Sequence, residues 1–283
     1  MINRSIWVAI ALAGAVVCAR GQWLNQRVPG TPRTHDGKPN LSAPVPRASN
    51  GKPDLSGVWQ AESATGADLA RLAPGGGGGA LSVPGEGVPS KYFINVLADF
   101  KPEESPLRPA AAAVFQQHAA TFSKDFPTAR CLPAGVPAGG LLPIPYKIIQ
   151  TPGVIVMLYE ADTTFRQIFT DGRKQPPDPQ PAWLGYSIGK WEGDWMVVDT
   201  IGFNDQSWLD ASGHPHSEAL HTVERFHRSD FGRMEVQVTI DDPKTFTKPF
   251  TFQFNQRLIP DTDLMETYCS ENEKDAGHLA AAK

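Results

Sequence analysis

Residues 183–228, WLGYSIGKWEGDWMVVDTIGFNDQSWLDASGHPHSEALHTVERFHR, decide how the rest of the chain is interpreted. Two alternating runs, 185–191 and 195–201, flank a short Glu-Gly-Asp turn, a pattern typical of a β-hairpin. A polar loop follows, and a third run at 216–227 again has the length and alternation of a strand. The stretch also holds four of the seven tryptophans and four of the seven histidines. We therefore predict consecutive strands here and expect any functional site to lie among them.

The same period of two extends to both sides of this stretch. Further alternating runs lie at 55–59, 146–150, 154–160, 164–170, 233–240 and 250–258, with a last segment at 264–269 that we expect to close the sheet. Helices do not alternate with these runs, and the connections are short. The pattern predicts a mainly β fold, an antiparallel meander that closes into a barrel, rather than an α/β fold. Closure would also remove exposed strand edges, which promote aggregation.

The first 21 residues have the pattern of a secretory signal peptide: a basic start at Arg4, an apolar run over 5–17 and small residues after it. Cys18 raises the alternative of a lipoprotein, but no small residue stands directly before it. No other apolar run is long enough to span a bilayer, so we expect no transmembrane segment. The sequence predicts an exported protein, periplasmic or extracellular.

The remaining segments follow from composition. Residues 22–54 are rich in Pro and Gly and contain a near-repeat, DGKPNLS at 36–42 and NGKPDLS at 50–56, which predicts an extended arm on the surface. We place a single barrel domain at 55–270, with a helical and loop insertion at about 62–144 whose clearest helix is 106–122. Residues 271–283 form a flexible tail in this interpretation.

The net charge bears on the partners of the protein, and the cysteine content bears on its disulfide bonds. The 283 residues carry a formal net charge of −4, which gives no reason to expect nucleic acid as a partner. If Cys18 leaves with the signal peptide, Cys131 and Cys269 remain. Two cysteines in an exported protein favour a disulfide between them, and two buried free thiols are the alternative.

Polar residues near the third run suggest acid–base chemistry. On a strand over 216–227, His216, Glu218 and Glu224 would share one face, and His221 would lie on the other. A histidine beside a carboxylate can move a proton, so we consider His216 with Glu218 or Asp210, and His221, as catalytic candidates. The alternative is a network of ion pairs across neighbouring strands, which stabilises many sheets.

A metal site is a second alternative in the same segment. His214, His216 and Glu218 could all reach one transition-metal ion. The spacings of the known zinc motifs are missing, however, and His-x-His is common by chance. We otherwise expect no cofactor.

The sequence Gly185-Tyr-Ser187-Ile-Gly189 matches the G-x-S-x-G pattern of α/β-hydrolases. In those enzymes the serine lies on a sharp turn between a strand and a helix. Here a hairpin follows instead, so we predict that Ser187 is not a nucleophile.

Aromatic and basic residues suggest ligand contacts at the mouth or inside the barrel. Trp208 lies in the polar loop, and loops at a barrel mouth often carry function. Trp183, Arg166, Arg173 and Glu224 are further candidates for contacts with an aromatic or acidic ligand. The alternative is that the tryptophans belong to the hydrophobic core.

Several motifs together are similar to a family of uncharacterised secreted bacterial proteins: NGKPDLSGVW, CLPAGVP, IFTDGR, SIGKWEGD and PHSEALH. This resemblance covers nearly the whole mature chain and implies export and a shared fold, but no activity. More loosely, the Gly57-Val-Trp59 opening before a meander resembles the lipocalin (calycin) barrels, which implies a cup with a ligand cavity.

Three functions remain open on this basis. The leading hypothesis is binding of a small apolar or aromatic molecule in the barrel cavity. The second is an enzyme that uses the His and Glu cluster for acid–base or metal-assisted chemistry. The third is a structural protein of the cell envelope.

Overall fold

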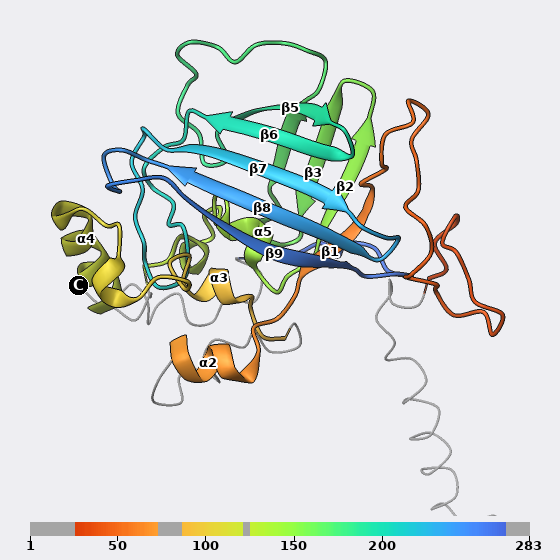
Figure 1. The fold of residues 1–283 in the computed structure, drawn as a ribbon, viewed down its shortest axis with the longest axis horizontal. Coiled ribbons are helices and arrows are strands. Elements are labelled where there is room, and N and C mark those ends of the chain that lie inside the picture. Colours follow the sequence, from red (N-terminus) through yellow and green to blue (C-terminus); the bar gives the residue numbers. More distant parts are fainter. Residues whose placement is uncertain (1–25, 73–86, 121–124, 270–283) are drawn as a thin grey trace, which may run out of the picture.

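The computed structural model describes residues 26–72, 87–120 and 125–269. In this part of the chain one sheet closes into a barrel whose strands follow the sequence order, and β1 pairs with β9 to complete it (Figure 1). The predicted mainly β barrel is therefore confirmed, while the predicted signal peptide and C-terminal tail lie outside the described residues. The strands are β1 (Gly57–Ala61), β2 (Tyr146–Thr151), β3 (Val154–Tyr159), β4 (Phe165–Phe169), β5 (Tyr186–Glu192), β6 (Trp195–Ile201), β7 (His221–Arg228), β8 (Arg233–Asp241) and β9 (Phe250–Leu258).

The topology corrects the prediction of a purely antiparallel meander at one place. β4 and β5 run parallel and are paired through Ile168 with Ser187 and Phe169 with Ile188. Parallel neighbours cannot be joined by a tight turn, and the long segment 170–185 carries the chain back to the starting end of the strand. The segment 264–269 forms no strand, because β1 already occupies the free side of β9.

Alternation along the strands fills the barrel interior with side chains. On β8 the inward residues are Met234, Val236, Val238 and Ile240, all of them buried as predicted. Trp59 of β1 is fully buried, and its indole Nε1 donates a hydrogen bond to the carbonyl of Leu55. Burial of large apolar side chains such as these contributes about 1.5–3 kcal/mol each to stability.

In its described residues, the predicted insertion between β1 and β2 contains short helices. The helix expected at 106–122 is confirmed as α4, which starts at Pro109, where the missing N–H costs no hydrogen bond. Another helix, at 91–94, ends where Asn95 adopts an extended conformation. The helices are α2 (Gly66–Leu72), α3 (Lys91–Ile94), α4 (Pro109–Ala120) and α5 (Ala138–Leu141), with 3-10 turns η2 (Pro102–Glu104), η3 (Pro127–Arg130) and, after β3, η4 (Ala161–Thr163).

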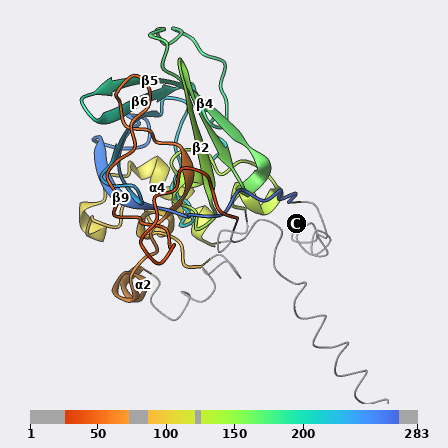
Figure 2. The ribbon, with the colours of Figure 1, turned by 90° about the vertical axis from the view of Figure 1, so that its right-hand side faces the viewer.

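The arm and the helix α4 lie at opposite ends of the barrel (Figures 1 and 2). Each copy of the repeat in the arm forms one small hairpin, and the backbone hydrogen bonds of the first copy recur fourteen positions later at the same lengths. Gly37 and Gly51 adopt positive φ angles at equivalent points of the two turns, which glycine tolerates best. The repeat is therefore a duplicated structural unit.

An arginine from each hairpin fastens the arm to the barrel. Arg33 binds both carboxylate oxygens of Asp261, which follows β9, with an Nη1–Oδ2 distance of 2.6 Å. Arg47 binds Asp194, in the β5–β6 turn, at 2.7 and 2.8 Å. Bidentate pairs of this kind fix geometry as well as supplying energy.

Cys131 and Cys269 form the predicted disulfide, with Cα atoms 5.5 Å apart and a sequence separation of 138. The bond ties the insertion to the segment that follows β9. Among the helices of the described residues, none has the length and apolar character needed to cross a membrane.

Candidate functional site

The barrel interior contains an ion pair between two of the predicted ligand-binding residues. Arg166 of β4 and Glu224 of β7 are both buried and joined by a hydrogen bond from Nη2. The guanidinium also donates to the hydroxyls of Ser187, at 3.0 Å, and Thr200, at 2.9 Å. The face of β7 that carries Glu224 therefore points into the barrel and not to solvent.

Electrostatics keep Arg166 in this interior cluster charged. Burial opposes the charge of Arg166, but Glu224 and Tyr159 outweigh it and raise the pKa of the guanidinium. Burial raises the pKa of Tyr159 to about 12, so its hydroxyl stays neutral.

Little free space remains around the cluster. Residues of α5 and the preceding loop, such as Val136 and Gly140, enter the barrel and contact its inner wall. The remaining cavity beside Arg166 and Glu224 has about 10 Å³, room for roughly one water molecule.

The serine of the G-x-S-x-G pattern belongs to this interior network. Ser187 lies within β5 and not on a strand–helix turn, and it bonds Arg166 and Thr200. Gly185 has a φ of +62°, and a Cβ there would lie 2.8 Å from the carbonyl oxygen of Ile201. Glycine is therefore needed here because the two backbone segments pack closely, and it does not form the nucleophile elbow of the hydrolases.

The loop between β6 and β7 forms the other polar cluster, at the end of the barrel covered by α4. The predicted strand over 216–227 begins only at His221, because Ser217 turns the chain and its N–H and hydroxyl bind Asp242. His216 and Glu218 consequently do not lie on the inward face of β7. Glu218 is exposed, whereas His216 is buried.

Asp210 does not pair with His216, as the sequence led us to consider, but with His214. His214 Nδ1 donates to Asp210 Oδ2 at 2.6 Å, and the same carboxylate accepts the backbone N–H groups of Val96, Gly213 and His214. Four hydrogen bonds make Asp210 the organising residue of the loop. Phe115 of α4 stacks on the His214 ring at 4.3 Å and holds the helix against it.

His216 is paired with a serine that the sequence did not suggest. Ser207 Oγ lies 2.7 Å from His216 Nε2, and His216 Nδ1 lies 3.1 Å from the carbonyl oxygen of Ser217. A carbonyl can only accept, so Nδ1 carries the proton and Nε2 of the neutral ring accepts from the serine. Burial lowers the pKa of His216 and favours this neutral form.

This pair lines a pocket of about 350 Å³ at the barrel mouth. One wall is the face of α4 with Ala110, Ala111 and Val114, and another is the loop with Trp208. Trp208, predicted to contact a ligand, is buried and stacks on His118 at 4.0 Å.

The remaining predicted residues lie apart from this pocket. His221 donates to Asp199 at 3.0 Å from the half-exposed outer face of β7, and Arg173 pairs with Asp171 in an exposed turn. Trp183 is half-buried just before β5. In the described residues, no group of three or more His, Cys, Asp or Glu is arranged to hold a metal ion.

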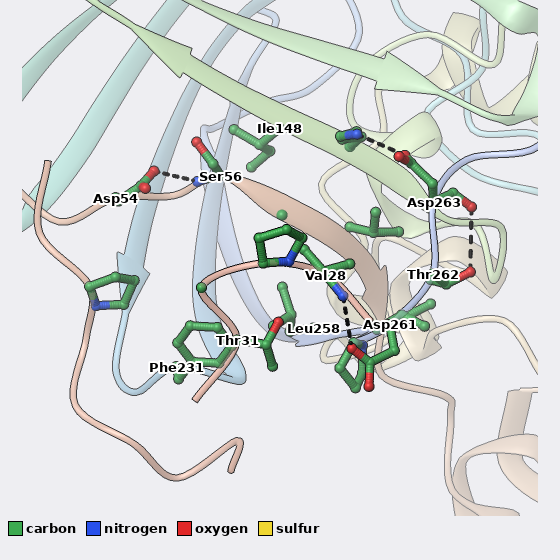
Figure 3. A pocket seen from close by; sticks show the side chains of 18 of the residues that line it. Val28, Thr31, Asp54, Ser56, Ile148, Phe231, Leu258, Asp261, Thr262 and Asp263 are labelled. Carbon is green, nitrogen blue, oxygen red and sulfur yellow. Dashed lines mark hydrogen bonds and ion pairs between the residues drawn. The ribbon is translucent and has the colours of Figure 1, made fainter. Parts of the chain in front are cut away.

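A larger groove, of about 570 Å³, lies between the arm and the barrel at the opposite end (Figure 3). Val28 and Thr31 of the arm form one side, and Ile148 and Leu258 of the barrel form the other. Two of its carboxylates are paired with cations, Asp261 with Arg33 and Asp263 with Lys147, and the third, Asp54, accepts the N–H of Ser56.

Arg228, at the end of β7, lines this groove with an unusual set of partners. Its guanidinium donates only to backbone carbonyls, among them those of Asp54 and Phe231, and no carboxylate of the described residues forms an ion pair with it. It packs over the rings of Trp59 and Phe231, at 4.9 Å from each centroid. Burial lowers its pKa to about 10, with partial compensation from Asp54 and Asp230.

Comparisons of the chain with models of protein families, with curated proteins and with solved structures found no match. The closed barrel agrees with the looser likeness to lipocalins. Membership of a family of secreted bacterial proteins stays a prediction from the motifs.

The sequence analysis missed two features of the structure, the pairing of Ser207 with His216 and the anchoring arginines of the arm. Ser207 and His216 are nine residues apart in an irregular loop, where no period indicates which side chains meet. The arginines of the PR-x-x-x-G-K-P repeat did stand at equivalent positions, at 33 and 47, and that regularity could have identified them as anchors.

Proposed function

We propose that the protein binds a small, mainly apolar or aromatic molecule with an acidic or carbonyl group in the groove between the arm and the barrel. The observation that carries this proposal is a groove of about 570 Å³ lined by a buried arginine without a carboxylate partner. Ligand pockets typically have 300–1,000 Å³, apolar walls and a few polar groups.

The charges in the groove favour an acidic or carbonyl group over a basic one. Asp261 is paired with Arg33 and Asp263 with Lys147, and the carboxylate of Asp54 accepts the N–H of Ser56, whereas the hydrogen bonds of Arg228 go to neutral backbone carbonyls. A buried guanidinium with no directly bonded carboxylate is costly, so an oxygen acceptor near Arg228 would gain free energy. The apolar side chains opposite, Leu258 and Ile148, would receive the body of the ligand.

The groove suits a ligand better than the barrel interior does. The interior cavity beside Arg166 has about 10 Å³, and its polar groups already bind one another. The proposal therefore keeps the class of ligand that the sequence favoured, a small apolar or aromatic molecule. It places that ligand in the groove beside the arm and not in the barrel interior.

Fluorescence titration with 8-anilinonaphthalene-1-sulfonate, an aromatic anion, tests the proposal. We expect saturable binding with energy transfer from tryptophan, since Trp59 packs against Arg228 at the groove. Naphthalene-2-carboxylate should displace the dye more effectively than its methyl ester, because only the acid carries a charge for Arg228 to neutralise.

Two substitutions locate the binding. Ile149→Trp should fill the groove and abolish binding, since Ile149 is a partly exposed lining residue. Val114→Trp, which likewise replaces an aliphatic side chain with tryptophan and fills the mouth pocket, is the control and should leave binding intact. Absence of saturable binding, or loss only in Val114→Trp, would contradict the proposal.

A further inference from the structure

Ser207 and His216 have the geometry of a nucleophile and its general base. The Oγ–Nε2 distance of 2.7 Å lies within hydrogen-bond reach, which is the first requirement of such a pair. The Nδ1–H of His216 donates to the carbonyl of Ser217, and this bond directs the free lone pair of Nε2 toward Ser207.

The surrounding structure holds this arrangement in place. Asp242, after β8, accepts the N–H of Ser217 at 2.6 Å and its hydroxyl at 2.8 Å, so the carbonyl that orients the imidazole cannot shift. Gly135 has a φ of +80°, and a Cβ there would collide with Ser207 Oγ. The hydroxyl is therefore confined between a glycine backbone and the imidazole.

The pair faces a cavity and not a closed core. Ser207 and His216 are 1% and 5% exposed, yet both line the pocket of about 350 Å³ at the barrel mouth. The face of α4 opposite them carries small apolar side chains, Ala110, Ala111 and Val114. A substrate would thus leave bulk water while its reacting carbon approaches the hydroxyl.

We propose that this pocket is a hydrolytic site for small carboxylic esters, with Ser207 as nucleophile and His216 as general base. Ser207 Oγ attacks the carbonyl carbon and Nε2 takes the hydroxyl proton. The bond from that carbon to the alcohol oxygen then breaks, and the alcohol leaves with the proton returned by His216. Water next attacks the acyl-serine, gives a proton to Nε2, and releases the acid as Ser207 regains its proton.

The N–H of the residue after a nucleophile often stabilises the oxyanion. Here that residue is Trp208, whose N–H donates no hydrogen bond to another part of the described chain. This inference goes beyond the proposed function: the groove lies at the other end of the barrel, and either proposal can fail without the other.

The decisive experiment labels the full chain with diisopropyl fluorophosphate, followed by intact-mass measurement and peptide mapping. We expect one label per chain, on the peptide that contains Ser207. Because the label is read on the unaltered protein, the result stands even if a variant fails to fold. No label, or a label on Ser187 or any other residue, overturns the proposal.

Hydrolysis of 4-nitrophenyl acetate gives a second readout. Ser207→Ala and His216→Ala should each lower the rate at least 100-fold, the range expected for loss of a nucleophile or base. Ser229→Ala, which removes an exposed hydroxyl in the β7–β8 turn, is the control and should keep the rate. An unchanged rate in a folded Ser207→Ala variant would show that the hydroxyl has no chemical role.

Discussion

Arg166 on β4 and Glu224 on β7 form an ion pair across the interior of the barrel, and their side chains are only 2% and 7% exposed. The strands that carry them are separated in the sheet by β5 and β6, whose Ser187 and Thr200 supply further oxygen acceptors to the same guanidinium. One side chain thus connects four neighbouring strands, including the parallel pair.

Removing one partner of this ion pair should be far more costly than removing both. We expect Glu224→Ala to lower the free energy of unfolding by about 3–5 kcal/mol, because it leaves a buried guanidinium without a counter-charge. The double variant Arg166→Met, Glu224→Leu should recover most of this loss, since apolar residues of similar volume replace the pair. Urea unfolding measures the free energy of unfolding of both variants. A double variant no more stable than Glu224→Ala would contradict the prediction.

The disulfide should be a major source of stability. Cys131 and Cys269 are separated by 138 residues, and closing a loop of that length in the unfolded chain is worth about 4–5 kcal/mol on the chain-entropy model. Cys131→Ser, Cys269→Ser and the double variant should lose the same amount, because each removes one and the same bond. Thermal unfolding with and without reductant measures the loss, and the reductant should have no effect on the three variants.

The two anchors of the arm should differ in strength. The side chains of Arg33 and Asp261 are 23% and 17% exposed, whereas those of Arg47 and Asp194 are 48% and 46% exposed. Ion pairs at the surface contribute little to stability, because water screens them, and the less exposed pair is screened less. Arg33→Ala should therefore speed hydrogen exchange in the first hairpin about fivefold, and Arg47→Ala should change the second hairpin less.

Lys38 offers a control for these arm variants, because its pair with Asp36 is almost fully exposed. Lys38→Ala removes a positive charge from the same hairpin and should leave exchange unchanged. Equal effects of Lys38→Ala and Arg33→Ala would show that overall charge, and not the contact with the barrel, holds the arm.

The barrel could be predicted from the sequence because the alternation of apolar and polar residues that specifies each strand can be recognised within a short run of the chain. Inward residues such as Val236 and Val238 alternate with polar ones, and a period of two allows few other structures. The parallel pairing of β4 with β5 could not be predicted, because it depends on the path of the segment 170–185. The residues of that segment show no regular alternation. The sequence therefore does not distinguish a hairpin connection from a crossover that returns the chain to the start of the strand.

The candidate sites could be predicted only in part, for a related reason. Arg166 and Glu224 were selected from the sequence as candidate ligand contacts, but alternation did not show whether the face of Glu224 points inward or to solvent, and the structure places both side chains inside the barrel. His216 was selected from the sequence, but as a strand residue beside Glu218. The position of its partner, Ser207, depends on hydrogen bonds between the loop and distant segments, from Ser217 to Asp242 and from Val96 to Asp210.

A half-buried carboxyl near the disulfide-linked end of the chain should make stability depend on pH. Burial raises the pKa of Asp162 from 3.8 to about 6, against a smaller lowering by the backbone N–H of Ala134. Between these two values the folded protein holds a proton that the unfolded chain releases. The contribution of this group to stability is therefore fully present below about pH 4 and is lost as the pH rises through 6.

Asp162→Asn should remove this dependence, because an amide has the size of the carboxyl and never ionises. Asp162 has a φ of +60°, a conformation that asparagine tolerates well, so the substitution should not strain the backbone. The variant should match the wild type at pH 4 and exceed it at pH 7 by about 1 kcal/mol, once partial exposure is allowed for. Urea unfolding at half-unit steps from pH 4 to pH 7 measures the difference between the two proteins, which cancels the titration of all other groups. A difference that stays constant over this range would show that Asp162 ionises equally in the folded and unfolded chain.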